Sequence, residues 1–163
     1  MSELFFKEQE LQKNISVVSD EFLMKYQNSS ILITGAGGSI GSKIVEELTK
    51  INCVNIILFD QSELNLFHIK KKNSSSNFIY ELADIRDSRR IDAIIQLYQP
   101  KLVIHTAAYK HVSMLEKNVT QAVSNNIIGT LNILKSADQN VKSITIISTD
   151  KAVYPLSVLG MTK

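Results

Sequence analysis

The chain has 163 residues, of which 44% are hydrophobic, so it is long enough for one domain with a substantial core. Its formal net charge of +2 is nearly balanced and implies no nucleic-acid partner, and we interpret the cluster Lys70–Lys72 as a solvated helix end. The single Cys53 excludes an internal disulfide and lies in an apolar run, so we expect a buried thiol in a cytoplasmic protein.

The first 29 residues are expected to form a helical extension. Leu11, Ile15, Val18 and Phe22 recur every three or four positions, the spacing of one helix face. No apolar run approaches the roughly 18 to 20 residues that cross a bilayer, and the charged N-terminus is unlike a signal peptide. We therefore predict a packing helix and no membrane span.

From Ile31 onward, β-branched runs alternate with segments of helical period, which is typical of βαβ units and a parallel sheet. The predicted strands are Ile31–Thr34, Asn55–Asp60, Phe78–Ala83, Leu102–Thr106 and Ser143–Ser148. The predicted helices are Ile40–Lys50, Glu63–Lys71, Ser88–Tyr98 and Thr120–Asp138, with a turn at Asn73–Asn77. Right-handed crossovers then give an α/β, Rossmann-type doubly wound sheet of order 3-2-1-4-5 over residues 30–163, with helices on both faces and the site at the carboxyl ends of the strands.

The loop after the first strand carries three glycines, Gly35, Gly38 and Gly41, and then opens a helix. Glycine permits a positive φ and a close approach of phosphate to backbone N–H groups, and the helix N-terminus adds partial positive charge. We predict a pyrophosphate site here, the alternative being only a tight turn. The residues placed in it are Gly35, Gly37, Gly38, Ser39, Ile40 and Gly41.

Asp60 ends the second strand, nineteen residues after Gly41, where a carboxylate can accept hydrogen bonds from both ribose hydroxyls of an adenosine. A carboxylate there repels a 2′-phosphate and so favours NAD over NADP. The alternative is that Asp60 caps the helix that begins near Glu63. Gln61 and Ser62, which follow it, are placed in the same cofactor site.

The third and fourth strands end in further candidates. Asp84 could bind the adenine amino group, with Ile85 beside it, and Ala107 and Ala108 are small enough for a cofactor to lie against the backbone. Each could also be an ordinary residue at a strand end. No metal site is predicted.

Several segments together resemble the extended short-chain dehydrogenase/reductase superfamily: ILITGAGGSIGSKI, LFDQSELNLF, ADIRD, VIHTAAYKHVSMLEKN, NNIIGTLNIL and ISTDKAV. The pairing of TAAYKHV with STDKAV is similar to the polysaccharide-biosynthesis branch, chiefly UDP-N-acetylglucosamine 4,6-dehydratases. The resemblance implies a nucleotide-sugar substrate and a redox cycle in which NAD takes hydride from C4, water leaves across C5 and C6, and hydride returns to C6.

The resemblance also implies catalytic roles for Thr149 near the C4 hydroxyl, Asp150 as acid toward the C6 oxygen and Lys151 as base at C5. Adjacent strand residues point to opposite faces, so these side chains can reach one substrate only if the chain bends after Ser148. Asp150 must also hold a proton and Lys151 must lack one, so both need shifted pKa values. A solvated polar cap is the alternative.

The loop after the fourth strand is implied to face the nicotinamide ribose or the sugar. It carries Tyr109 toward the cofactor, and Lys110 and His111 toward the substrate. Taken alone, a histidine such as His111 is more often an ordinary loop residue. Asn126 is implied to support the active site and is placed with the substrate residues, the alternative being a helix-face asparagine. Self-association through Thr120–Asp138 is expected, although Ile127, Leu131 and Leu134 could instead be core.

The chain departs from the superfamily at Leu159, which stands where Tyr-x-x-x-Lys carries its tyrosine, whereas Lys163 holds the lysine position for catalysis and cofactor binding. The base for the C4 hydroxyl is thus unassigned. The chain stops where a helix should start, so we expect a fragment without its substrate domain, inactive alone. The leading hypothesis is a nucleotide-sugar 4,6-dehydratase; the alternatives are an epimerase or reductase, or a non-catalytic nucleotide-binding module.

Overall fold

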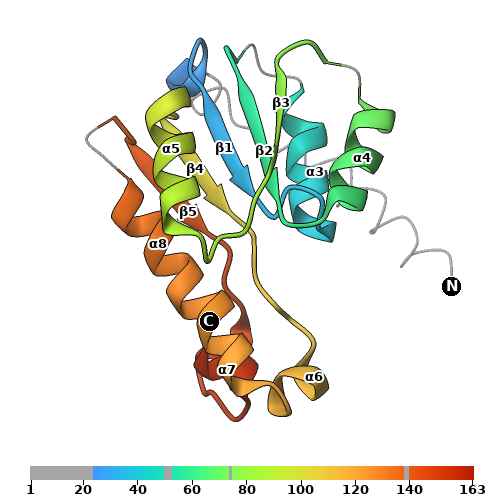
Figure 1. The fold of residues 1–163 in the computed structure, drawn as a ribbon, viewed down its shortest axis with the longest axis vertical. Helices are drawn as coiled ribbons and strands as arrows, with labels where there is room; N and C mark the ends of the chain where they lie inside the picture. The colour runs from blue at the N-terminus through green and yellow to red at the C-terminus, as the bar shows by residue number, and fades with distance from the viewer. Residues whose placement is uncertain (1–23, 50–52, 74, 138–139) are drawn as a thin grey trace, which may run out of the picture.

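A computed structural model describes residues 24–49, 53–73, 75–137 and 140–163. It contains one parallel sheet of five strands, β1 (Ile31–Thr34), β2 (Ile56–Asp60), β3 (Phe78–Leu82), β4 (Leu102–His105) and β5 (Ser143–Ile146). The strand order is β3-β2-β1-β4-β5, as predicted (Figure 1). The register pairs Thr34 with Phe59 on one side and with His105 on the other, so that the carboxyl ends of the three central strands lie level.

Helices cover both faces of the sheet (Figure 1). Helices α3 (Ser39–Leu48) and α4 (Glu63–Lys72) cover one face, and α5 (Ser88–Tyr98) and α8 (Gly129–Ser136) cover the other. Alternate residues of the strands feed two separate cores: Ile31 and Ile33 belong to the first, and Leu32 to the second. The doubly wound fold is thus confirmed.

The strands differ in burial. Strands β1, β2 and β4 are buried throughout, as continuous apolar runs predict, whereas β3 and β5 lie at the sheet edges and expose Leu82 and Ile146. The two edge strands are therefore partly exposed, unlike the three central strands. Cys53 is buried in the first core, as expected, and Lys70–Lys72 form the last turn of α4.

The segment expected to be one helix from Thr120 to Asp138 is interrupted. It consists of α7 (Val119–Ala122), a π-helix η1 (Val123–Ile128) and α8. A further short helix, α6 (Val112–Glu116), was not predicted, and the 3-10 turn η2 (Asp150–Ala152) precedes α9 (Val158–Met161). The N-terminal helix expected around Leu11–Phe22 lies outside the described residues. Within them, no helix is long and apolar enough to cross a membrane.

Candidate functional site

The glycine loop between β1 and α3 can be built only from glycines at its tightest points. Gly35 has a φ of +68°, and a Cβ there would lie 2.8 Å from the backbone of Ala107. A Cβ on Gly41 would lie 2.2 Å from the carbonyl oxygen of Gly35. Helix α3 begins with Gly38 as its N-cap and has no side-chain cap and no acidic residue in its first turn. Its first N–H groups, from Ser39 and Ile40, are therefore left open to an anion.

Asp60 connects the end of β2 to this loop. Its side chain is buried, and Oδ2 accepts a hydrogen bond from the Gly37 N–H at 2.9 Å while Oδ1 accepts one from the Ser62 N–H at 2.8 Å. The N-cap of α4 is Ser62, whose Oγ accepts from the Asn65 N–H at 3.3 Å. The capping role considered for Asp60 thus belongs to Ser62.

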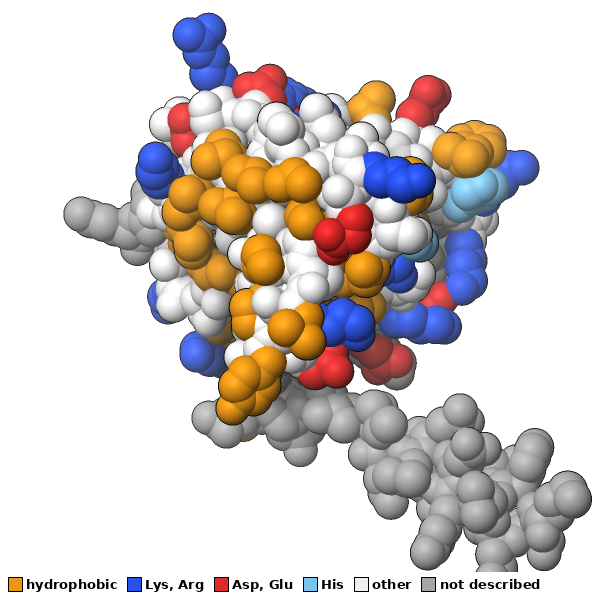
Figure 2. Space-filling view, turned by 90° about the horizontal axis from the view of Figure 1, so that it is seen from below, with side chains coloured by type: hydrophobic (Ala, Val, Ile, Leu, Met, Phe, Trp, Pro, Cys, Tyr) orange, Lys and Arg blue, Asp and Glu red, His pale blue; other side chains and the backbone are white. Residues whose placement is uncertain are grey.

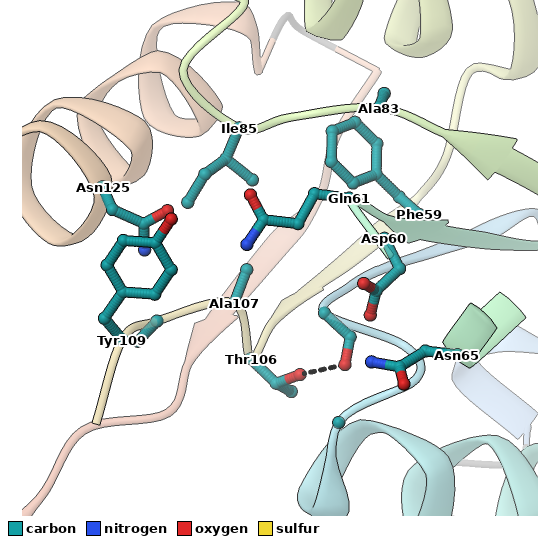
Figure 3. A pocket seen from close by; sticks show the side chains of 13 residues that line it. Phe59, Asp60, Gln61, Asn65, Ala83, Ile85, Thr106, Ala107, Tyr109 and Asn125 are labelled. Carbon is teal, nitrogen blue, oxygen red and sulfur yellow. Dashed lines mark hydrogen bonds between the residues drawn. The ribbon is translucent and has the colours of Figure 1, made fainter. Parts of the chain in front are cut away.

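A pocket opens at the carboxyl ends of the central strands (Figure 3). It joins the glycine loop, the ends of β2, β3 and β4, and the π-helix. Its lining residues are Gly35, Gly38, Phe59, Asp60, Gln61, Asn65, Ala83, Ile85, Thr106, Ala107, Ala108, Tyr109 and Asn125. Figure 3 shows Asp60 and Asn65 at one end, Tyr109 and Asn125 at the other, and Gln61 extending between them.

Eight of the predicted cofactor residues line this pocket, whereas the other seven do not: Gly37, Ser39, Ile40, Gly41, Ser62, Asp84 and Lys163. The Asp84 carboxylate accepts hydrogen bonds from the Arg86 backbone N–H at 2.9 Å and from its guanidinium Nε at 3.0 Å. This interaction with Arg86 lowers the pKa of Asp84 below its ordinary value. The guanidinium also donates to Gln121 Oε1 of α7 at 3.2 Å, so Arg86 joins Asp84 to α7.

A second, more apolar pocket adjoins the first at Ala108 and Tyr109. Lys110 and His111 line it, so the two residues predicted to face a substrate lie together. The opposite wall comes from the α6 and α7 region and includes Met114, Leu115, Asn118 and Gln121. This wall was missed because α6 has only five residues, too few for a periodic pattern.

The π-helix turns two consecutive asparagines inward. Asn125 and Asn126 are 3% and 4% exposed, although neighbouring residues of an α-helix lie about 100° apart. The Asn126 Oδ1 accepts from the Tyr109 N–H at 2.8 Å, and its Nδ2 donates to the Tyr109 carbonyl and to Thr162 Oγ1, both at 3.1 Å. The amide of Asn126 is thus used within the protein, whereas Asn125 lines the first pocket.

The chain bends after β5, as the predicted roles of residues 149–151 require. Thr149 is the N-cap of η2, and its hydroxyl donates to Asp150 Oδ1 at 2.9 Å. Lys151 Nζ lies 3.5 Å from the same carboxylate, whose side chain is 88% exposed. The Thr149 hydroxyl and the Lys151 charge lower the pKa of Asp150, so the carboxyl is ionised at neutral pH.

Lys163 and Leu159 lie on or next to α9. Leu159 is buried against Leu115 and Ala122. Lys163 Nζ donates to the Ile147 carbonyl at 2.6 Å, and burial lowers the pKa of its ammonium group. At the position of the superfamily tyrosine, the structure therefore has an apolar packing residue, four positions before a half-buried lysine.

Sequence reasoning missed several pocket residues, namely Phe59, Asn65, Ala83, Thr106 and Asn125. Thr106 was assigned to the strand, yet its hydroxyl donates to the Thr34 carbonyl at 2.8 Å. It also donates to the Gly35 carbonyl at 3.1 Å, the bond drawn in Figure 3. Its place directly before the two alanines was a usable signal. Asn65 was also accessible, because it lies in the first turn of the helix that follows Asp60.

Comparison with known proteins places the chain in a family. The model of the family described as polysaccharide biosynthesis protein matches residues 31–163. The capsular polysaccharide biosynthesis protein CapD of Staphylococcus aureus is 40% identical over 142 residues, which are 83% of this chain and 24% of CapD. An inverting UDP-N-acetylglucosamine 4,6-dehydratase of Campylobacter jejuni is 34% identical over 85% of this chain and 41% of that protein. UDP-glucose 4-epimerases also match, at 29% identity for the protein of Rickettsia prowazekii.

Solved structures agree with this placement. The structure of Pen from Bacillus thuringiensis superposes with a TM-score of 0.80 and 32% sequence identity, covering 85% of this chain and 42% of Pen. The chain spans about a quarter to two fifths of the length of these relatives. It belongs to the polysaccharide biosynthesis protein family, within the extended short-chain dehydrogenase/reductase superfamily of nucleotide-sugar dehydratases and epimerases.

Proposed function

We propose that this chain binds NAD+ and forms the cofactor-binding part of a nucleotide-sugar 4,6-dehydratase that acts on UDP-N-acetylglucosamine in surface polysaccharide biosynthesis. The observation that carries the cofactor proposal is the joint geometry of the glycine loop and Asp60. The loop has a positive φ at Gly35 and an uncapped helix N-terminus, and it is tied to a buried carboxylate. An adenosine ribose and a pyrophosphate need this combination of acceptor and open N–H groups.

Different residues in and around the first pocket are assigned to different parts of the cofactor. Asp60, with Gln61 and Ser62 beside it, holds the adenosine ribose, and the open N–H groups of Ser39 and Ile40 hold the pyrophosphate. Ile85, Ala107 and Ala108 pack against the rings. Tyr109 and Lys163 belong to the nicotinamide end. The negative charge of Asp60 disfavours the 2′-phosphate of NADP.

Bound NAD+ would supply the hydride acceptor for oxidation at C4 and the hydride donor at C6. Oxidation at C4 also releases the proton of the C4 hydroxyl, whose acceptor is not assigned, and C5 regains a proton when hydride returns to C6. The elimination between these two steps moves two further protons. Lys151 removes the C5 proton, which the adjacent C4 ketone makes acidic, and Asp150 protonates the leaving C6 oxygen. Thr149 holds the C4 hydroxyl, and Lys110 and His111 contact the sugar nucleotide.

Asp150 cannot be the acid in the arrangement described for the chain alone, because its carboxyl is exposed and its pKa lies below the ordinary value. Exclusion of water would raise this pKa, since burial penalises the charged form. We therefore propose that the chain alone does not turn over and that the part of the family fold beyond these residues closes over Asp150.

The dehydratase proposal is favoured over the epimerase by one feature of this site. Leu159 is buried and has no ionisable group where the superfamily base stands, whereas a Thr-Asp-Lys run lies at the turn after β5. Product analysis with UDP-N-acetylglucosamine separates the two activities in the longer protein. A 4-keto-6-deoxy product supports the dehydratase, and a C4 epimer would contradict it.

Self-association is part of the same proposal. Of the three residues that could have been core, Leu131 and Leu134 on α8 are 40% and 42% exposed, whereas Ile127 is half-buried. Ile128, next to α8, is 45% exposed. Side chains of this size are costly to leave in water, and burying them between two copies recovers that free energy. The end of the molecule near α6 and α7 also exposes a broad cluster of hydrophobic side chains (Figure 2).

A further inference from the structure

Three polar side chains form a buried chain of hydrogen bonds beneath the candidate cofactor site. His105, the last residue of β4, is 1% exposed. Its Nδ1 lies 2.6 Å from the hydroxyl of Thr34, the last residue of β1, and its Nε2 lies 2.9 Å from the hydroxyl of Thr130 in α8. None of the roles proposed above uses this histidine.

The direction of each hydrogen bond follows from the partners. The Thr130 hydroxyl donates its single proton to the Asn126 carbonyl at 2.6 Å, and a carbonyl oxygen can only accept. His105 Nε2 must therefore carry the proton and donate to Thr130. A neutral imidazole has one N–H, so Nδ1 is an acceptor and the Thr34 hydroxyl donates to it. The chain of bonds runs in one direction from Thr34 to Asn126.

Burial favours the neutral ring that this pattern requires. Desolvation and the nearby positive charge of Lys163 lower the pKa of His105 to about 4. Lys163 is the one charged group that acts on the ring among the described residues. The threonine hydroxyls that face it from β1 and α8 are uncharged.

This series of hydrogen bonds ends next to the glycine loop on one side and next to the Tyr109 loop on the other. Thr34 directly precedes Gly35 of the glycine loop, and its carbonyl accepts from the Thr106 N–H at 3.1 Å. At the other end, Asn126 fixes both backbone groups of Tyr109 and reaches Thr162, the neighbour of Lys163.

We propose that His105 is a positioning residue, held as the Nε2–H tautomer, that links the conformation of the glycine loop to that of the Tyr109 loop through Thr34, Thr130 and Asn126. A link of this kind lets the pyrophosphate end and the nicotinamide end of the site adopt their geometry together. Its role in cofactor binding rests on the proposed function. The link itself is a property of the protein without ligand.

The tautomer is tested directly on the 163-residue chain by the imidazole ¹⁵N chemical shifts at pH 7. We expect His105 to show a protonated Nε2 and an unprotonated Nδ1. A protonated Nδ1, or a ring protonated on both nitrogens, would overturn the proposal. This measurement needs no variant and no ligand.

The link is tested by a double-mutant cycle with amide hydrogen exchange as the readout. Thr34→Val keeps the side-chain shape and removes the proton given to His105, and His105→Phe removes both hydrogen bonds of the ring. We expect Thr34→Val to speed exchange of the Tyr109 N–H by about five- to tenfold, the effect of weakening one hydrogen bond. In the His105→Phe background, Thr34→Val should have no further effect.

Equal effects in both backgrounds, or no effect in either, would show that Thr34 does not act through His105. Where His105→Phe does not fold, His105→Gln serves as the background. Thr49→Val, at the exposed end of α3, is the matched control and should leave Tyr109 exchange unchanged.

An NAD+ titration of the same proteins separates this proposal from the proposed function. Weaker NAD+ binding by Thr34→Val than by the wild type extends the link to the cofactor. Equal affinity would overturn its role in cofactor binding and leave the link as a property of the unliganded protein. Absence of NAD+ binding by the wild type overturns the proposed function, and the exchange cycle alone then decides on the link.

Discussion

The carboxylate of Asp60 accepts a hydrogen bond from the backbone N–H of Gly37 at 2.9 Å, although the two residues are 23 positions apart in the sequence. The same carboxylate accepts from the Ser62 N–H, so it joins the glycine loop to the start of α4. A residue proposed to bind the adenosine ribose therefore also shapes the loop proposed to bind the pyrophosphate.

Asp60→Asn should weaken NAD+ binding by about tenfold. The amide retains one acceptor oxygen, but its NH₂ group would then face a backbone N–H, and two donors cannot bond. Loss of the negative charge should also narrow the preference for NAD+ over NADP+. Calorimetric titration with both cofactors measures the two effects, and unchanged values for both would argue against a ribose role.

Gly35→Ala should destabilise the chain by about 2–4 kcal/mol. The new Cβ would lie 2.8 Å from the Ala107 backbone at a φ of +68°, so strain and overlap add. Gly38→Ala is the matched control, because Gly38 has a φ of −70° and a Cβ there would meet only the Gly35 carbonyl, at 3.2 Å. Urea unfolding of both variants tests this, and equal losses would contradict the account.

Asn126→Ala should cost about 2–4 kcal/mol of unfolding free energy, because it leaves the N–H and the carbonyl of Tyr109 without their partner. The control is Asn132→Ala, whose amide donates to the Ile85 carbonyl at 3.1 Å from a less buried position. Its loss should be near 1 kcal/mol. A smaller loss for Asn126→Ala than for this control would show that Tyr109 is held by other contacts.

Stability should fall as the pH is lowered from 7 to 4.5. The pKa of His105 is lowered from 6.5 to about 4 in the folded chain, so over this interval the unfolded chain binds the additional proton. The folded state should lose about 2 kcal/mol between these pH values through this group. Urea unfolding at both values measures the loss. His105→Gln has no titrating ring, so a pH dependence as steep as that of the wild type would refute the assignment.

Leu134→Glu should reduce self-association, because it places a charge in the exposed apolar group on α8. Light scattering after size-exclusion chromatography gives the mass of each species. Leu64→Glu on α4, which covers the other face of the sheet, is the control, since Leu64 is 63% exposed and should leave the mass unchanged. A wild-type chain that is monomeric at high concentration would remove this part of the proposal.

The strands and their order could be predicted because apolar runs of β-branched residues mark buried parallel strands. Predicted ends were least accurate at β5, which stops at Ile146 rather than Ser148 because the chain turns there toward η2. The π-helix could not be predicted, because one widened turn leaves the 3.6-residue spacing of apolar residues on either side almost unchanged. For that reason Asn125 was missed, whereas Asn126 was singled out by the resemblance, and its side chain holds the backbone of Tyr109.

Contacts between side chains that are distant in the sequence could not be predicted either. The pairing of Asp84 with Arg86 is local, yet the additional bond to Gln121, 35 positions away, depends on the placement of α7. The buried environment of His105 depends on residues from three elements. Motifs locate such residues at strand ends, but only packing decides which of their atoms remain open to a ligand.

The most direct test of the account is calorimetric titration of NAD+ into the wild-type 163-residue chain, with Asp60→Ala as the matched variant. The account predicts one NAD+ bound per chain and binding weakened at least tenfold in the variant. Absence of binding by a folded wild-type chain, or equal binding by the two proteins, would contradict it.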